Sequence, residues 1–183
     1  MNLDDIKARL PETAKDLRLN LGTVLTTPGL TPTQAWGAAL AAAIAARNAD
    51  LVAALDGAAP LDAANRAAAR TAASLMAMNT IYYRFVHLMK PSVPDYATMP
   101  ARLRMQGMAS HGADTVDFEL WSIAVAAVVG CGMCLEAHEH EVLKKGASRE
   151  MVQAVVRIAA VVHAIAVTLD SVAVLEPGIA AAA

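Results

Sequence analysis

The amino-acid sequence predicts an all-α protein, and its composition and its helix signals both support that prediction. Hydrophobic residues make up 56% of the 183 residues and aromatic residues only 4%, because alanine and the aliphatic side chains supply most of the apolar surface. Such a composition is typical of closely packed helices. Helix caps and helix stops recur along the chain, whereas the alternating pattern of a β-strand hardly appears.

Four helices are expected in the N-terminal part of the chain. Thr31 followed by Pro32, for example, is an N-cap with proline at the first helical position. A segment with several prolines, residues 90–99, must form a loop or a series of turns, and it is the expected linker at the middle of the chain. The expected helices span residues 11–19, 36–47, 50–57 and 62–85.

The C-terminal part is expected to hold four more helices and to end in a loose tail at residues 178–183. Gly130 and Gly132 weaken the helical pattern beside the two cysteines. One helix carries Glu119, and three polar residues can cap it: Asp114, Thr115 or Asp117. The other expected helices span residues 102–110, 134–145 and 148–169.

An internal similarity indicates that the two halves of the chain are related. Aligning Gln34-Ala35-Trp36 with Glu119-Leu120-Trp121 places three alanines opposite three residues of the second half that can carry chemistry. The alanines are Ala46, Ala49 and Ala53, and their counterparts are Cys131, Cys134 and His138. We therefore expect one domain over residues 1–183, with a non-catalytic helical half at 1–90 and a site-bearing half at 100–175.

The charge pattern argues against several classes of partner. The net charge is −2 and the isoelectric point is near 6.2. The sequence has no block of lysine or arginine that would bind nucleic acid or an anionic membrane surface. Mean hydropathy is +0.41, but the uncharged run at residues 120–135 is too short and too interrupted by glycine to span a bilayer. The first residues lack the pattern of a secretory signal, so a cytoplasmic location is expected.

Cys131 and Cys134 are the only cysteines, and two residues separate them. In a reducing compartment such a pair favours redox chemistry or metal binding over a structural disulfide. The spacing is compatible with the Cα separation that a reversible disulfide requires. His138 follows Cys134 by one helical turn on the same face, and Glu119 on the preceding helix can orient this histidine or take its proton.

Redox chemistry needs the thiolate, and a free thiol with a pKa near ~8.5 is mostly protonated at neutral pH. If Cys134 lies early in its helix, the exposed backbone N–H groups favour the anion. His138 can accept the proton directly or through water. We therefore expect the surroundings of Cys134 to favour its thiolate.

Two alternatives remain open at this point. The cysteines could be small core residues, which is a common role for cysteine in an alanine-rich helix. They could also bind zinc together with His138 and either His140 or Glu141. No second cysteine pair exists, and ligands from one short helical stretch close a tetrahedron poorly, so the redox interpretation is favoured and no metal is expected.

Glu119 followed by Cys131-x-x-Cys134-x-x-x-His138 resembles the active-site pattern of the alkylhydroperoxidase D (AhpD) family. Further motifs spread over the whole chain are similar to the actinobacterial type of this family, within the carboxymuconolactone decarboxylase-like superfamily. They include Leu10-Pro11-Glu12, Trp36-Gly37, Met78-Asn79, Tyr83-Arg84 and Phe118-Glu119-Leu120-Trp121.

The resemblance implies an all-helical thiol peroxidase that assembles as a homotrimer and binds no cofactor. Cys134 would attack hydrogen peroxide or an alkyl hydroperoxide, and Cys131 would close the disulfide. Glu119 would be the base, acting with His138 through a water-linked relay. Electrons would come from dihydrolipoamide on a 2-oxoacid dehydrogenase acyltransferase, recharged by dihydrolipoamide dehydrogenase, and could pass on to the peroxiredoxin AhpC.

One residue departs from the pattern that the resemblance suggests. Related proteins carry histidine between the cysteines, where this chain has Met133, which cannot shuttle a proton. A changed rate or pH profile is therefore expected. Two other functions stay open: a non-redox enzyme like carboxymuconolactone decarboxylase, and a redox sensor or adaptor whose disulfide controls partner binding.

Overall fold

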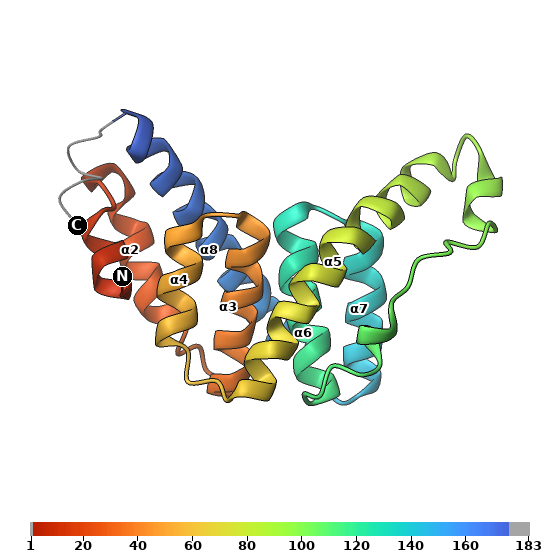
Figure 1. The fold of residues 1–183 in the computed structure, drawn as a ribbon, viewed down its shortest axis with the longest axis horizontal. Helices are drawn as coiled ribbons and strands as arrows, with labels where there is room; N and C mark the ends of the chain where they lie inside the picture. The colour runs from red at the N-terminus through yellow and green to blue at the C-terminus, as the bar shows by residue number, and fades with distance from the viewer. Residues whose placement is uncertain (1, 176–183) are drawn as a thin grey trace.

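A computed structural model describes residues 2–175, and every regular element within them is helical (Figure 1). The predicted all-α fold is confirmed. Three short 3₁₀ turns, Glu12–Ala14, Pro94–Ala97 and Gln106–Met108, separate some of the longer elements. The α-helices of this part of the chain are α1 (Leu3–Ala8), α2 (Lys15–Val24), α3 (Pro32–Ala46), α4 (Ala49–Ala58), α5 (Ala63–Met89), α6 (Thr115–Val129), α7 (Gly132–Lys144) and α8 (Arg149–Leu175).

Side-chain caps set most of the helix starts. Thr31 accepts the N–H of Gln34, whose side chain accepts the N–H of Thr31 in return, so a capping box opens α3. Of the three candidate caps of α6, Asp114 is the one used, and it accepts N–H groups of the first turn. Asn48 and Asp62 cap α4 and α5 in the same way.

Several predicted boundaries differ from the structure. A helix over residues 102–110 is wrong: Arg102 has a positive φ of 52°, which breaks a right-handed helix, and only a 3₁₀ turn follows. The expected helix at residues 11–19 begins later, at Lys15, and runs on to Val24. The short helix α1 was not predicted, although Asn2 and Asp5 form a capping box there. The tail predicted at residues 178–183 lies outside the described residues.

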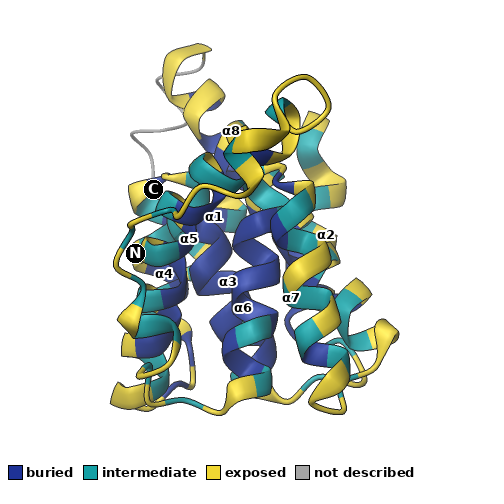
Figure 2. Cartoon of the chain, turned by 90° about the vertical axis from the view of Figure 1, so that its right-hand side faces the viewer, coloured by how far each residue is buried: buried dark blue, intermediate teal, exposed yellow. Residues whose placement is uncertain are grey.

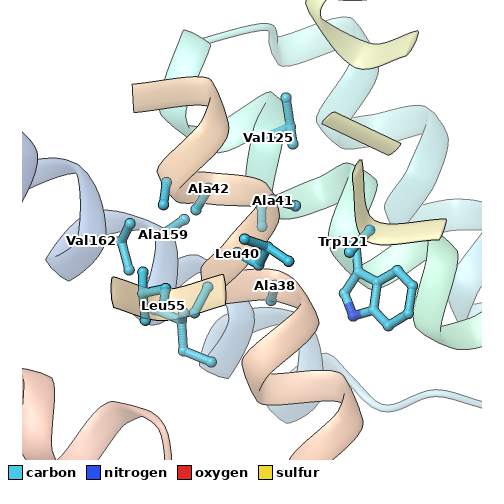
Figure 3. Packing of buried hydrophobic residues seen from close by; sticks show 14 of the residues in the cluster. Ala38, Leu40, Ala41, Ala42, Leu55, Trp121, Val125, Ala159 and Val162 are labelled. Atoms are coloured by element: carbon cyan, nitrogen blue, oxygen red, sulfur yellow. The ribbon is translucent and has the colours of Figure 1, made fainter. Parts of the chain in front are cut away.

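Helices α3 and α6 form the centre of the core, and Figure 2 shows them as the most continuously buried elements. Each of them packs against the other and against both long helices, α5 and α8. Small residues line much of α3, and Leu40 and Ala41 lie among side chains of the neighbouring helices in Figure 3. Short side chains let helix backbones approach closely, so packing density comes from proximity rather than from bulky residues.

The contact of Trp121 with α3 is a close approach of two helices in this core. The indole of Trp121 is fully buried and lies against Gly37, where an added Cβ would overlap the ring. Its Nε1–H donates to the carbonyl of Gln34 at 3.2 Å. The Gln34 side chain in turn donates to Asp117 Oδ1 at 2.8 Å. This set of contacts fixes the position of α6 relative to α3.

The two sets of helices α3–α5 and α6–α8 correspond in length and in their turns. They have 15, 10 and 27 residues in the first set and 15, 13 and 27 in the second. Arg47 after α3 and Gly130 after α6 both adopt the left-handed conformation. The next residues, Asn48 and Cys131, are both N-caps. The correspondence supports the predicted relation of the halves, which stays a prediction.

These turns correct the register of the sequence alignment. The N-caps pair Cys131 with Asn48, so Cys134 corresponds to Leu51 and His138 to Leu55. The sequence alignment had placed alanines there, because it matched the two tryptophans, Trp36 and Trp121. The turn between two helices is the better reference, since its backbone geometry is shared by both sets.

Helix α8 is, among residues 2–175, the one helix long and apolar enough to cross a membrane by length and composition. It packs against α2, α3 and α6, and a core helix passes the same test. The finding is therefore weak evidence for a membrane, and the expected absence of one stays a prediction.

The Gly37–Trp121 contact makes a stability prediction. Gly37→Ala should lower the free energy of unfolding by about 1–3 kcal/mol, because the new methyl group overpacks the core. Gly22→Ala is the matched control: beyond its chain neighbours and the nearby backbone of its own helix, no atom lies within 4 Å of its added Cβ. Alanine is the better helix former, so stability should stay equal or rise by up to about 1 kcal/mol. Denaturant unfolding measures both, and equal stability of the two variants would contradict the prediction.

Candidate active site

A sharp turn between α6 and α7 places the two cysteines. Gly130 ends α6 with a φ of 69°, a left-handed conformation that glycine adopts at little cost. The N–H of Cys131 then donates to the carbonyl of Ala126 at 3.0 Å, and Arg84 of α5 donates to the carbonyl of Val129 at 3.0 Å. The expected weakening of the helix at Gly130 is therefore confirmed, and these bonds hold the turn in place.

Cys131 is the N-cap of α7, and its Sγ accepts the backbone N–H of Cys134 at 3.4 Å. Both side chains thus lie at the start of one helix, and neither thiol is in a disulfide. Cys131 is 0% exposed and Cys134 is 4% exposed. Cys134 is the outer thiol of the pair, because it lines a cavity that Cys131 does not line.

The cavity in front of Cys134 has a volume of about 250 Å³ and a mostly apolar wall. Its walls come from three separate parts of the chain: α5, the segment before α6, and the first turns of α7. The lining residues are Asn79, Tyr83, Met105, Met108, Met133, Cys134, Ala137 and His138. A small organic molecule can fit such a space, and the three methionines give it an adaptable apolar surface.

His138 and Glu119 meet as the sequence predicted, and a third residue joins them. His138 Nδ1 lies 2.6 Å from Glu119 Oε2, and Lys145 Nζ lies 2.6 Å from Glu119 Oε1. Lys145 was not predicted. Its only sequence signal is its position two helical turns after His138, on the same face of α7.

These contacts decide the charge of Glu119. Burial by itself raises the pKa of this carboxyl, but the hydrogen bonds from His138 and Lys145 outweigh it and hold the pKa below its ordinary value. An ionised Glu119 can only accept a hydrogen bond, so His138 donates to it from Nδ1, and Nε2 is the ring nitrogen that Glu119 does not contact. Of the two roles expected for Glu119, the geometry favours orienting the histidine.

The expectation that the surroundings favour a Cys134 thiolate is wrong for the resting protein. Burial, followed by the hydrogen bond and the charge of Cys131, raises the pKa of Cys134 to about 12. Cys134 does lie in the first turn of α7, but its own N–H points at Cys131. The resting thiol is therefore protonated, and its proton has to leave for a nearby base during any reaction.

A metal site finds no support in this geometry. Within residues 2–175, no group of three or more His, Cys, Asp or Glu side chains is arranged to hold a metal ion. Glu141, one of the ligands considered for zinc, is an exposed partner of Lys144 at 2.9 Å instead.

Comparison with known proteins identifies the family. A model of the carboxymuconolactone decarboxylase family matches residues 94–177, which include Glu119, Cys131, Cys134 and His138. The alkyl hydroperoxide reductase AhpD of Rhodospirillum centenum is 56% identical over 178 residues, covering 96% of this chain and 95% of the relative. The chain belongs to the AhpD family.

Other members of the AhpD family match over a similar length. The alkyl hydroperoxide reductase AhpD of Acidobacterium capsulatum is 51% identical, covering 97% of both chains. That of Brucella canis is 49% identical, covering 93% of this chain and 98% of the relative. The AhpD resemblance predicted from the site motif and the scattered motifs is therefore confirmed over nearly the whole chain.

The raised pKa of Cys134 makes a prediction about its reactivity. The rate of Cys134 alkylation should rise about tenfold per pH unit from pH 7 to 9 without a plateau, because the thiolate fraction grows tenfold per unit below the pKa. Cys131→Ser should speed the reaction at each pH, since Cys131 contributes to the raised pKa. Mass spectrometry of the labelled peptide follows both. A plateau near pH 7 in the native protein would contradict a high pKa.

Proposed function

We propose that this protein is an antioxidant thiol peroxidase, which reduces hydrogen peroxide and alkyl hydroperoxides to water and alcohols. The observation that carries the proposal is the arrangement of Cys134 beside His138 in an apolar cavity, with Cys131 directly behind it in the same turn. The relatives that match along the whole chain are named alkyl hydroperoxide reductases, which supports the same reaction class.

In the first step, Cys134 is the peroxidatic residue. Its thiol gives its proton to His138 Nε2, which is free because Glu119 holds Nδ1. The thiolate attacks one oxygen of the hydroperoxide, so a sulfur–oxygen bond forms and the oxygen–oxygen bond breaks. The departing alkoxide takes the proton from His138. The products are an alcohol and the sulfenic acid of Cys134, and the sulfur has lost two electrons.

In the second step, Cys131 resolves the sulfenic acid. Its sulfur attacks the sulfur of Cys134, water leaves, and a Cys131–Cys134 disulfide forms. The backbone N–H of Cys134 donates to Cys131 Sγ. This hydrogen bond stabilises the negative charge that the Cys131 sulfur carries as it attacks. The short spacing at a helix start suits the disulfide.

The burial of the cysteines supports a slender electron donor. Because Cys134 is 4% exposed and Cys131 is fully buried, a reducing thiol has to enter on a narrow arm rather than on a broad protein surface. Dihydrolipoamide, linked to a dihydrolipoamide acyltransferase and recharged by dihydrolipoamide dehydrogenase from NADH, is such a donor. We infer it as the reductant, and the peroxiredoxin AhpC as a protein that this cycle can serve in the cytoplasm.

A homotrimer is part of the same proposal. The alanine-rich face of α3 cannot form the interface, since residues 38–43 are buried inside this chain. The last turns of α5 instead project from the other helices (Figure 1). They expose Ile81, Phe85 and Leu88 on one face, an apolar stripe of the kind that packs against other subunits.

Coupled turnover tests the proposal. Loss of NADH is followed with tert-butyl hydroperoxide, lipoamide and dihydrolipoamide dehydrogenase. Cys134→Ser should abolish turnover, because it removes the attacking sulfur, whereas Cys131→Ser should consume one equivalent of peroxide and stop at the sulfenic acid or a mixed disulfide. Equal residual turnover in both variants would contradict the assigned roles.

The same assay separates the alternatives. Activity on a small organic acid that survives replacement of both cysteines would support a non-redox enzyme of the carboxymuconolactone decarboxylase kind, the name of the matching family. Reversible oxidation with negligible turnover would support a redox sensor or adaptor.

Met133 gives a second prediction on activity. It lines the cavity next to Cys134, so Met133→His adds a titratable group beside the dithiol. The pH profile of kcat/KM should gain an inflection near the ordinary histidine pKa of ~6.5. Met133→Leu, which keeps the position apolar, should leave the shape of the profile unchanged. Superimposable profiles of Met133→His and the native protein would show that proton delivery does not depend on this position.

A further inference from the structure

Asn79 carries a buried amide oxygen without a partner, and the residue lines the same cavity as the Cys134 thiol. The residue lies on α5 and is 5% exposed. Its Oδ1 is buried and has no hydrogen-bond partner. Its side chain lines the same cavity as Cys134 and His138. A buried acceptor without a donor costs stability, and native proteins keep few of them. An unpaired acceptor on a residue that lines a cavity is therefore a candidate partner for a ligand that donates.

The rest of the cavity wall offers little competition for such a ligand. Three of the lining side chains are methionines, whose sulfur is a weak acceptor, and Ala137 has no polar group. His138 offers Nε2, but this nitrogen is needed for the proton of Cys134. The Tyr83 hydroxyl also lines the cavity, so two acceptors stay free while the thiol ionises, and Asn79 Oδ1 is the buried one that lacks a donor.

We propose that Asn79 orients the hydroperoxide by accepting a hydrogen bond from its O–H group at Oδ1. The inference rests on the proposed peroxidase function and names the chemical group that the site recognises. It favours hydroperoxides over dialkyl peroxides, because the latter have no O–H to donate. The alkyl part of the substrate then lies against the apolar wall formed by Met105 and Met108.

This orientation decides which oxygen reacts. With the O–H group on Asn79, the Cys134 thiolate attacks the oxygen that carries the hydrogen, the sulfur–oxygen bond forms and the oxygen–oxygen bond breaks. The hydrogen stays on the sulfenic acid. The alkoxide leaves toward the alkyl side of the cavity and takes the proton that His138 received from Cys134. Atoms, charge and the two transferred electrons balance in this step.

Single-turnover oxidation of the full-length protein tests the proposal. Asn79→Leu keeps the side-chain volume but removes the acceptor. We expect it to slow oxidation of Cys134 by hydrogen peroxide and by tert-butyl hydroperoxide about 10- to 100-fold, as for the loss of a hydrogen bond to the reacting group. Methyl methanethiosulfonate has no hydrogen-bond donor and so makes no use of the Asn79 oxygen. The rate of its reaction with Cys134 should therefore change less than about twofold.

A matched control and a stability measurement exclude a structural role. Thr80→Val alters the next residue of α5, whose hydroxyl is buried but already bonded to the Met76 carbonyl, and should leave both reactions unchanged. The melting temperature of Asn79→Leu should be equal to or above that of the native protein, since an unpaired polar group has been removed. Asn79→Ala should show the same selective loss if the leucine variant does not fold.

Four results would overturn the inference. Hydroperoxide oxidation of Asn79→Leu at the native rate would show that the amide does not contact the substrate. Equal slowing with the thiosulfonate, or a lowered melting temperature, would show that Asn79 shapes the site rather than binds. A native protein that hydroperoxides do not oxidise would instead remove the proposed function itself, and this inference with it.

Discussion

The close packing of α6 on α3 is the contact on which the rest of the structure depends. Gly37 leaves room for the indole of Trp121, and the hydrogen bond between Gln34 and Asp117 joins the same two helices. With α6 held there, Glu119 is presented on one side of the helix and Gly130 turns the chain at its end. Both the carboxylate and the cysteine turn are therefore positioned by one rigid helix, which suits a site that needs accurate geometry.

Burial raises the pKa of both acidic groups of the site, but the two net shifts have opposite directions. It raises the pKa of Cys134, because no cation or strong donor offsets it. Glu119 is also shielded from solvent, yet His138 and Lys145 more than compensate, and its pKa falls. The result is a protonated thiol beside a histidine oriented by a carboxylate. In the proposed mechanism the protonated sulfur is unreactive at rest and His138 supplies the base that it needs. Paired groups with separated pKa values divide acid and base roles in this way.

The two sets of helices use one turn in two ways. After α3, Asn48 caps α4 and donates to Asp170 of α8, and the positions equivalent to the outer cysteine and the histidine are Leu51 and Leu55 of the core. After α6, the same turn carries Cys131, and α7 presents the reactive residues to a cavity instead. The two sets thus share a turn, while the cysteines and His138 lie in the second set.

The sequence by itself determined the helical class, most helix starts and the candidate residues of a dithiol site, because caps, periodicity and the C-x-x-C-x-x-x-H spacing act over a few neighbouring residues. Only the tertiary structure decided the partners of those residues. Lys145 on Glu119, Arg84 on the end of α6 and Asn79 in the cavity come from separate segments. These contacts form only because α5, α6 and α7 pack together, and no local sequence pattern specifies how these helices pack. The raised pKa of Cys134 cannot be predicted from the local pattern for the same reason, since burial is a property of the assembled core.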